Sequence, residues 1–419
     1  MKTSQLAEGL KGSEIIKIAG EVNALKAQGE VIYNQTIGDF DANIFPIPEA
    51  LKQAIVDAYT DNQTNYPTAN GMESLREVVS RYLSIHLDLD YELNEILISG
   101  GARPLIYAMY QTILDIDDTV LYPVPSWNND AYTYLSRNKA VMIPTSPENK
   151  FMPTVEDIKP HIRNVNLIAL CSPLNPTGTT FDKETLLGIS QLVIDENKRR
   201  IAENIKPLYI LYDQIYWQLT YGAIEHYNPV SLLPEMKAYT LFVDGISKAF
   251  AATGVRVGWA FGPLHVIDKM KAMLSHIGAW APKAEQVATA NFLSQTEAVS
   301  TYLNHIKEEL NYRLIAFYDG FERLKDLGLP VRAIQPEAAL YLTVQFDLIG
   351  KTTMDGAKLN TIQDVTRYLL QEAKLALVPF YAFGASTDSN WFRLSVGTAK
   401  KEDVPIIFGL LEDALGQLK

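Results

Sequence analysis

Short apolar runs alternate with amphipathic stretches along the first two thirds of the chain. Mainly apolar runs that end at turn residues predict buried strands at residues 96–98, 119–122, 140–143, 166–171, 208–212 and 239–243, with a further apolar run at 257–261. Helical spacing of apolar positions predicts helices at residues 50–59, 72–85, 104–114 and 183–204. This alternation is typical of an α/β fold with a mostly parallel sheet.

The two ends of the chain have a different pattern. Helices are predicted at 264–275, 284–294, 298–327, 361–373 and 404–418, and strands at 340–346, 376–378 and 392–396. The amino-terminal part predicts a helix at 13–28 and an extended segment at 31–40. We therefore expect a large α/β domain at 46–300 and a smaller α+β domain at 301–419, with segment 1–45 packing against the smaller domain.

Composition narrows the possible functions. The chain has 419 residues and a net charge of −12, which disfavours nucleic acid and anionic membrane surfaces as partners. Its single cysteine, Cys171, excludes an intrachain disulfide framework and fits a reducing compartment. The six histidines show no metal-ligand spacing, so no metal site is expected. No apolar run approaches the roughly 18 residues of a membrane span, and no signal-peptide h-region opens the chain. These features predict a cytoplasmic protein.

Glycines follow the first predicted strand. Gly100 and Gly101 precede a predicted helix that we expect to begin at Pro104, because proline is favoured at the first helical position. The amides of Gly100, Gly101 and Ala102 would then lie at a helix amino end, where free N–H groups and the helix dipole favour an anion.

A lysine follows the strand at 239–243. Asp244-Gly245 is a turn signal that should end this strand, and Ser247-Lys248 comes just after it. Burial or a neighbouring cation such as Arg256 would lower the pKa of the Lys248 amine and make it a nucleophile toward a carbonyl. Taken alone, a Ser-Lys pair is more often found in an ordinary surface loop.

Three other strand ends carry candidate groups. Trp127 follows one strand, Asn175 another, and Asp213 a third, with Tyr216 close behind. The Asn175-Pro176 bond is a candidate cis peptide. Because the carboxyl ends of parallel strands meet at one edge of a sheet, these side chains should lie near the glycines and Lys248.

The chemistry that uses these groups together is that of a phosphorylated aromatic aldehyde. The lysine would form an imine, the aspartate would hold a protonated ring nitrogen, and the indole would stack on the ring. The Gly-Gly amides and Arg256 would bind the phosphate, while Asn175 and Tyr216 would hydrogen-bond a phenolic oxygen. This set of groups predicts pyridoxal 5′-phosphate as cofactor.

The sequence resembles the class I/II aminotransferases of the fold-type-I pyridoxal phosphate family, of which aspartate aminotransferase is an example. The segments that carry the likeness are Gly100-Gly101-Ala102, Pro125-Ser126-Trp127, Asn175-Pro176-Thr177-Gly178, Asp213-Gln214-Ile215-Tyr216, Ser247-Lys248 with Arg256-Val257-Gly258, and Asn390-Trp391-Phe392-Arg393-Leu394-Ser395. The resemblance implies a large domain with a mostly parallel seven-stranded sheet flanked by helices, plus a smaller α+β domain.

It also implies roles for individual residues. Lys248, Asp213 and Tyr216 would be catalytic, with Lys248 moving a proton between the substrate Cα and the cofactor. Arg393 would bind the substrate α-carboxylate opposite the backbone of Gly38, with help from Asn175. The implied cofactor-binding set is Tyr66, Gly101, Ala102, Arg103, Trp127, Asn175, Asp213, Tyr216, Ser247, Lys248 and Arg256. Tyr66 would reach the active site of a neighbouring subunit, which predicts a homodimer.

Some departures from the family pattern leave undetermined which substrate side chain the pocket accepts. Ala102 stands where some aspartate-specific relatives have lysine, and the amino-terminal Gly38-Asp39-Phe40 is shortened. Gly245 stands where many relatives have a serine, so one hydroxyl that would bind the phosphate is missing. Arg103 and the aromatic residues Phe40, Tyr66 and Trp127 could favour substrates with acidic or aromatic side chains.

The favoured hypothesis is an aminotransferase that moves an amino group between an L-amino acid and a 2-oxo acid in ping-pong half-reactions. A C–S β-lyase or another elimination enzyme would use the same residues. A remote alternative is the non-catalytic domain of a transcription regulator, which the acidic charge and the short segment before Gly38 disfavour.

Overall fold

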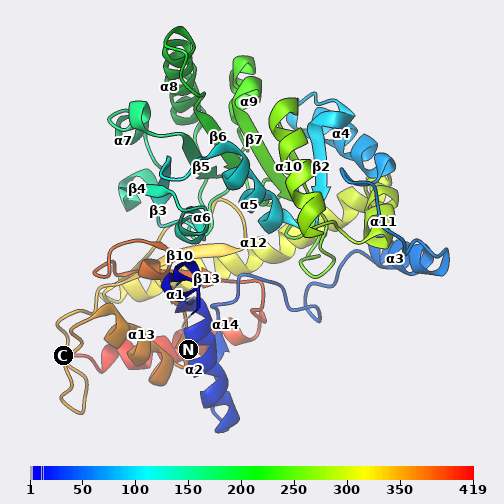
Figure 1. The fold of residues 1–419 in the computed structure, drawn as a ribbon. Helices are drawn as coiled ribbons and strands as arrows, with labels where there is room; N and C mark the ends of the chain where they lie inside the picture. Colours follow the sequence, from blue (N-terminus) through cyan, green and yellow to red (C-terminus); the bar gives the residue numbers. More distant parts are fainter. Residues whose placement is uncertain (1–2, 11, 13) are drawn as a thin grey trace.

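A seven-stranded sheet forms the centre of the larger part of the molecule in this computed structural model, which describes residues 3–10, 12 and 14–419 (Figure 1). Its strand order is β2-β8-β7-β6-β5-β3-β4. The strands are β2 (Ile96–Ser99), β3 (Thr119–Val124), β4 (Lys139–Pro144), β5 (Leu167–Cys171), β6 (Tyr209–Asp213), β7 (Thr240–Gly245) and β8 (Gly258–Phe261). Within this sheet β8 runs opposite to the other six strands, so the prediction of a mostly parallel seven-stranded sheet is confirmed.

Helices cover both faces of the sheet because successive strand residues point to opposite sides. In β6, Ile210 and Tyr212 join one buried apolar cluster, and Tyr209 and Leu211 join the other. The first cluster includes residues of α4 (Glu73–Leu87), α8 (Lys183–Ala202), α9 (Pro229–Leu232) and α11 (Lys283–Leu293). The second includes residues of α5 (Ala102–Ile113), α6 (Asn129–Leu135) and α10 (Leu264–Ile277). The first cluster also includes residues of α3 (Glu49–Thr60), which packs on α11, and of the short α7 (Val155–Ile158), which packs on α8.

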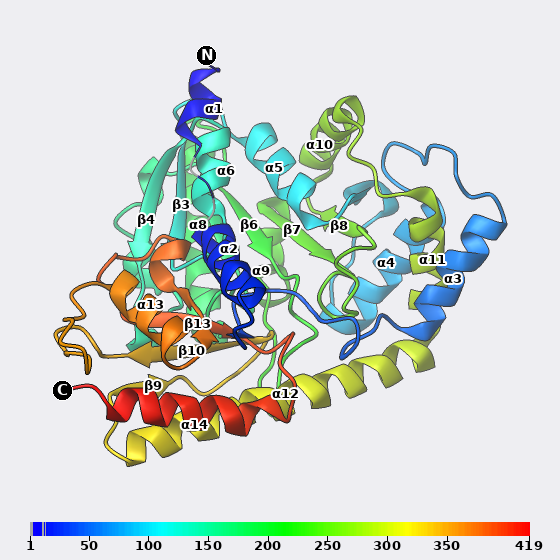
Figure 2. The same ribbon diagram turned by 90° about the horizontal axis from the view of Figure 1, so that it is seen from below.

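A smaller antiparallel sheet forms the second part of the molecule, with strand order β12-β13-β10-β9. Its strands are β9 (Val331–Ala333), β10 (Tyr341–Phe346), β12 (Val378–Pro379) and β13 (Trp391–Ser395). A third apolar cluster joins this sheet to α12 (Thr296–Asp326), α13 (Ile362–Gln371) and α14 (Asp403–Gly416). Figure 2 shows α12 running from the region of α3 and α11 to a position beside α14.

The amino-terminal segment contacts both parts of the molecule, since the Tyr134 hydroxyl of α6 donates to the carbonyls of Gln5 and Leu6 while Tyr33 and Asn34 pair with residues 375–376. It contains α1 (Gln5–Gly9) and α2 (Glu14–Ala27), and then β1 (Tyr33–Asn34), which pairs in parallel with β11 (Leu375–Ala376). This pairing supports the predicted domain boundary at 45/46. The boundary predicted at 300/301 lies in the first turns of α12, and both boundaries stay predictions. The first residue predicted for the amino-terminal helix, Ser13, lies outside the described residues.

Three details differ from the sequence expectations. The helix expected to begin at Pro104 begins at Ala102, which places the proline in the first turn, where its missing N–H breaks no intrahelical bond. The predicted strand 376–378 is two short strands. Asp244 is not in a surface turn but is 1% exposed within β7 and accepts a hydrogen bond from Trp217 Nε1 at 2.8 Å. Burial raises the pKa of its carboxyl to about 8.

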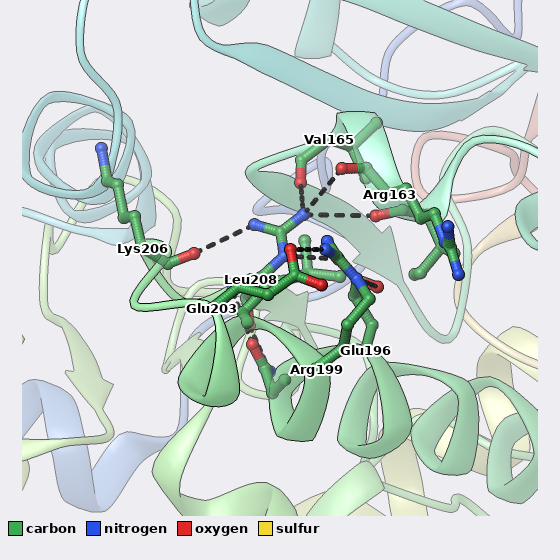
Figure 3. A network of polar contacts seen from close by, with 10 residues as sticks. Arg163, Val165, Glu196, Arg199, Glu203, Lys206 and Leu208 are labelled. Atoms are coloured by element: carbon green, nitrogen blue, oxygen red, sulfur yellow. Dashed lines mark hydrogen bonds and ion pairs between the residues drawn. The ribbon is translucent and has the colours of Figure 1, made fainter.

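A buried arginine fixes the amino ends of two central strands (Figure 3). Arg200, near the end of α8, donates to the carbonyl of Val165 before β5 at 2.6 Å and to that of Lys206 before β6 at 3.1 Å. Glu196 accepts from Arg200 Nε and from Arg199 Nη2, both at 2.7 Å. This network ties α8 to the sheet edge opposite the carboxyl ends of these strands.

No helix within the described ranges combines the length and the apolar character that crossing a bilayer requires.

Candidate active site

A cavity of about 810 Å³ lies at the carboxyl ends of the parallel strands. It collects most of the residues that sequence analysis singled out. Its lining includes Gly38, Ala102, Arg103, Trp127, Asn175, Asp213, Tyr216, Ser247, Lys248, Arg256 and Arg393. The expectation that these strand-end residues converge at one edge of the sheet therefore agrees with the geometry.

Lys248 lies in the connection between β7 and β8, with its amine inside the cavity. Its Nζ donates a hydrogen bond to the carbonyl oxygen of Gly38 at 2.7 Å. Burial lowers the pKa of the amine to about 8, Asp39 opposes this shift, and the surrounding guanidinium groups add to it. Far more of the amine is therefore neutral and nucleophilic near neutral pH than for an ordinary lysine.

Asp213 ends β6 and presents its carboxyl to the same cavity. Burial raises the pKa of this carboxyl to about 6, while the backbone N–H of Ile215, 3.1 Å from Oδ1, and the charge of Lys248 oppose the shift. A buried carboxyl of this kind gains stability from a cationic N–H partner, which a protonated ring nitrogen would supply.

The amino end of α5 and Arg256 form a cradle for an anion. Arg256 donates from Nη2 to the carbonyl of Gly100 at 2.9 Å and from Nη1 to that of Thr253 at 2.6 Å. Gly101 caps the helix with φ at 91°, and a Cβ there would lie 2.3 Å from Arg256 Nη2. Glycine is thus required for the guanidinium to approach the helix end, where backbone N–H groups also favour an anion.

Arg393 extends from β13 and is 2% exposed. Among the described residues, its Nη1 donates to Asn175 Oδ1 at 3.0 Å and its Nη2 to the Thr36 carbonyl at 2.6 Å, while Nε has no partner. The guanidinium carbon lies 4.7 Å from the ring centroid of Tyr341. A buried guanidinium bonded only to neutral oxygens fits an incoming carboxylate.

Trp127 and Tyr216 form an aromatic wall of the cavity, and Arg103 and Asn175 add polar groups to its lining. Arg103 places its guanidinium carbon 4.5 Å from the ring centroid of Trp127. The Asn175–Pro176 peptide bond is cis, as predicted. Tyr216 is buried, and its hydroxyl lies 2.7 Å from that of Tyr341.

These residues fit pyridoxal 5′-phosphate. The cradle matches a phosphate, Asp213 suits a protonated ring nitrogen, and Lys248 is a neutral-prone amine that can reach a carbonyl. The site thus offers groups suited to the aldehyde, the ring nitrogen and the phosphate of the cofactor.

Comparison with known proteins decides the family. A family profile described as "Aminotransferase class I and II" matches residues 34–407. The chain belongs to this family. The aminotransferase is 27% identical to an aspartate aminotransferase of Geobacillus stearothermophilus over 95% of each chain. It is 28% identical to a probable aspartate/prephenate aminotransferase of Rickettsia felis, over 94% of this chain and 91% of the other.

Solved structures agree with this assignment. The crystal structure of the aspartate aminotransferase from Rhizobium meliloti superimposes with a TM-score of 0.91 at 26% identity, covering all of both chains. That of Thermus thermophilus with maleate gives a TM-score of 0.86 at 25% identity, covering 99% of this chain and all of the other. The predicted fold class, transamination activity and pyridoxal phosphate dependence of the enzyme are thus confirmed.

Two predicted residues of the aminotransferase are not among those that line the cavity. Gly101 lies just behind the lining, where it shapes the anion cradle. Tyr66 is 82% exposed and contacts Trp280 edge-on, with ring centroids 5.2 Å apart. Its proposed contact with a neighbouring subunit stays a prediction.

Sequence reasoning missed several lining residues. Ile15 and Ile16 of α2 reach the cavity, as do Thr253 and Tyr341. Thr253 donates to Asp39 Oδ1 at 2.8 Å, which joins the amino-terminal segment to the connection that carries Lys248. The shortened Gly38-Asp39 sequence is a local feature that pointed to Asp39 as a site residue. No local sequence feature marks Tyr341 as one.

Proposed function

We propose that this pyridoxal phosphate-dependent aminotransferase works through two half-reactions that share one cavity, with Lys248, Asp213 and Tyr216 as catalytic residues. An L-amino acid would react in the first half-reaction and a 2-oxo acid in the second. The observation that carries this assignment is the position of the Lys248 amine, which shares the cavity with the Asp213 carboxyl and the Arg393 guanidinium. Within the part of the chain that the structure describes, this guanidinium donates only to neutral oxygens.

Lys248 is the proposed proton carrier. When bound, pyridoxal 5′-phosphate supplies a conjugated ring that takes up the electron pair left on the substrate Cα after deprotonation. The Lys248 Nζ removes the Cα proton, for which its lowered pKa of about 8 is suited. Asp213 holds the proton on the ring nitrogen, because its buried carboxylate is stabilised by a cationic partner.

Cofactor binding is assigned to the cradle and the aromatic wall. The phosphate would be bound by the backbone at Gly101 and Ala102, by Ser247 and by Arg256. The indole of Trp127, which the Arg103 guanidinium contacts in this structure, would stack on the ring. Tyr216 and Asn175 would donate hydrogen bonds to the phenolic oxygen.

Arg393 is the proposed anchor for the substrate α-carboxylate, with the backbone of Gly38 and the side chain of Asn175 beside it. Gly38 suits this place because a Cβ there would lie 3.3 Å from Arg393 Nη1. The names of the relatives make aspartate the first amino donor to test.

We further propose a homodimer in which Tyr66 enters the neighbouring active site, and a cytoplasmic location. The exposed position of Tyr66 supports the first, and the single cysteine in the sequence supports the second.

A half-reaction screen tests the proposal. Purified enzyme loaded with pyridoxal 5′-phosphate is mixed with single L-amino acids, and the loss of its visible absorbance is followed. Donors should bleach the absorbance and yield the matching 2-oxo acid, and a 2-oxo acid should restore it. The Lys248→Ala variant should lose at least about 100-fold in rate, whereas Lys52→Ala, on the exposed face of α3, should not change it. Pyruvate and ammonia as products would point instead to elimination.

A further inference from the structure

Tyr341 connects the two sides of the active site. It begins β10 and is 1% exposed. In the ladder with β13, Tyr341 pairs with Ser395 and Thr343 pairs with Arg393. Tyr341 and Arg393 are therefore diagonal neighbours on one face of the small sheet, which explains why the guanidinium lies 4.7 Å from the Tyr341 ring centroid.

The hydroxyl of Tyr341 points away from the small sheet toward the large one. It lies 2.7 Å from the hydroxyl of Tyr216, which belongs to the loop after β6. It also passes close to Gly38, where a Cβ would approach it to 2.9 Å. A residue of the small sheet thus contacts Tyr216, which is assigned to the cofactor, and Arg393, which is assigned to the substrate.

The hydroxyl geometry leaves the donor of this hydrogen bond open, and the charge of Arg393 bears on its direction. Burial raises the pKa of both phenols, so both hydroxyls keep their protons near neutral pH. Two hydroxyls joined by one hydrogen bond leave one O–H free to donate elsewhere. If Tyr216 were the donor, the Tyr341 proton would be left beside the Arg393 cation. Electrostatics therefore favours Tyr341 as the donor, with its oxygen lone pairs toward Arg393.

We propose that Tyr341 is a positioning residue that directs the Tyr216 hydroxyl toward the cofactor and supports the Arg393 guanidinium with its ring. With Tyr341 donating, the remaining Tyr216 proton is free to point into the cavity at the phenolic oxygen. Hydrogen bonds in such a chain also strengthen one another. This inference rests on the roles proposed above for Tyr216 and Arg393.

A pH titration of the visible absorbance tests the hydroxyl. In the loaded enzyme, a weaker donor to the phenolic oxygen leaves its negative charge less stabilised, so the protonated chromophore persists to higher pH. Tyr341→Phe should therefore raise the midpoint by about half a unit to one unit. It should also weaken binding of pyridoxal 5′-phosphate to the apoprotein by about two- to tenfold. Tyr368→Phe removes a buried hydroxyl that donates to Ala414 far from the cavity, and it should leave the midpoint unchanged.

A double-mutant cycle tests the connection with Tyr216. In a Tyr216→Phe background, adding Tyr341→Phe should shift the midpoint no further. A wild-type midpoint in Tyr341→Phe, or a shift of equal size in both backgrounds, would overturn the proposal.

The ring is tested separately with maleate as a non-reacting carboxylate. Tyr341→Phe keeps the ring and should bind maleate within about twofold of the wild type, whereas Tyr341→Leu should bind it at least about fivefold more weakly. Equal maleate affinity in all three proteins would refute the supporting role of the ring. Failure of the proposed function itself would look different, because Arg393→Lys would then leave maleate binding unchanged.

Discussion

The amine of Lys248 donates a hydrogen bond to the carbonyl oxygen of Gly38, which lies 210 positions earlier in the chain. The contact joins the connection after β7 to the amino-terminal segment, whose strand β1 pairs with β11. It holds the amine inside the cavity before any carbonyl compound arrives.

Reconstitution of the apoprotein should depend on pH through the Lys248 amine. Only the neutral amine attacks an aldehyde, and burial lowers its pKa from 10.5 to about 8. The rate of imine formation with pyridoxal 5′-phosphate, measured by stopped-flow absorbance, should rise with pH and level off above about 8. Pyridoxine 5′-phosphate, which has no aldehyde, should bind without this rise. A midpoint near the ordinary lysine value would contradict the prediction.

Replacement of Arg393 by lysine should damage substrate binding despite the conserved charge. Lysine cannot form the bidentate pair with a carboxylate, and it would leave Asn175 and the Thr36 carbonyl without their present donors. We expect kcat/KM for amino donors to fall by about 100-fold or more, mainly through KM. Arg367→Lys, on the exposed face of α13, is the matched control and should retain normal kinetics. A normal KM in Arg393→Lys would exclude this residue as the anchor.

The role of Tyr66 can be tested by mixing subunits. The family resemblance implies that the Tyr66 hydroxyl binds the phosphate of the neighbouring subunit's cofactor. Tyr66→Phe homodimers should therefore bind pyridoxal 5′-phosphate about two- to tenfold more weakly, because that hydrogen bond would be lost. Hybrids of Tyr66→Phe and Lys248→Ala subunits contain one site with Lys248 and with Tyr66 from the other chain. That site should regain normal affinity for the cofactor. If affinity stays low in the hybrids, or light scattering shows a monomer, Tyr66 does not act across subunits.

Glu196→Gln should destabilise the fold without changing the chemistry of folded enzyme. Glu196 is 5% exposed and accepts hydrogen bonds from both Arg199 and Arg200. Loss of its charge leaves the Arg200 guanidinium buried without its counter-ion, which typically costs about 3–5 kcal/mol. Denaturant unfolding of the loaded enzyme measures this loss. Glu412→Gln breaks the exposed ion pair with Arg323 and should cost about 1 kcal/mol or less. Similar losses in the two variants would show that the network in Figure 3 does not stabilise the sheet.

The sequence predicted the sheet and most of the cavity for a common physical reason. Asp213 and Lys248 each follow a buried apolar strand, and the carboxyl ends of parallel strands meet at one edge. Their approximate positions therefore followed from the strand pattern before any contact was known.

Other residues could not be predicted because their surroundings are set by distant segments. Tyr341 is one aromatic residue of an apolar strand, and only the meeting of the two sheets brings it to Tyr216. Asp244 precedes a glycine and indicates a turn, but Trp217 supplies the donor that lets its carboxyl remain buried in β7. The helix start predicted at Pro104 was two residues too late, because proline is tolerated throughout the first turn.

The single reversed strand, β8, has a further consequence for how the site can vary. Because β8 runs antiparallel to β7, the connection 246–257 leaves and re-enters the sheet at the same edge. A parallel successor would need a crossover of about a dozen or more residues and would begin at the opposite edge. The shared location of Lys248 and Arg256 is thus a property of strand direction, whereas the spacing between them belongs to a loop. Insertions or deletions in that loop would change the distance between the Lys248 amine and the Arg256 guanidinium while the sheet stays intact.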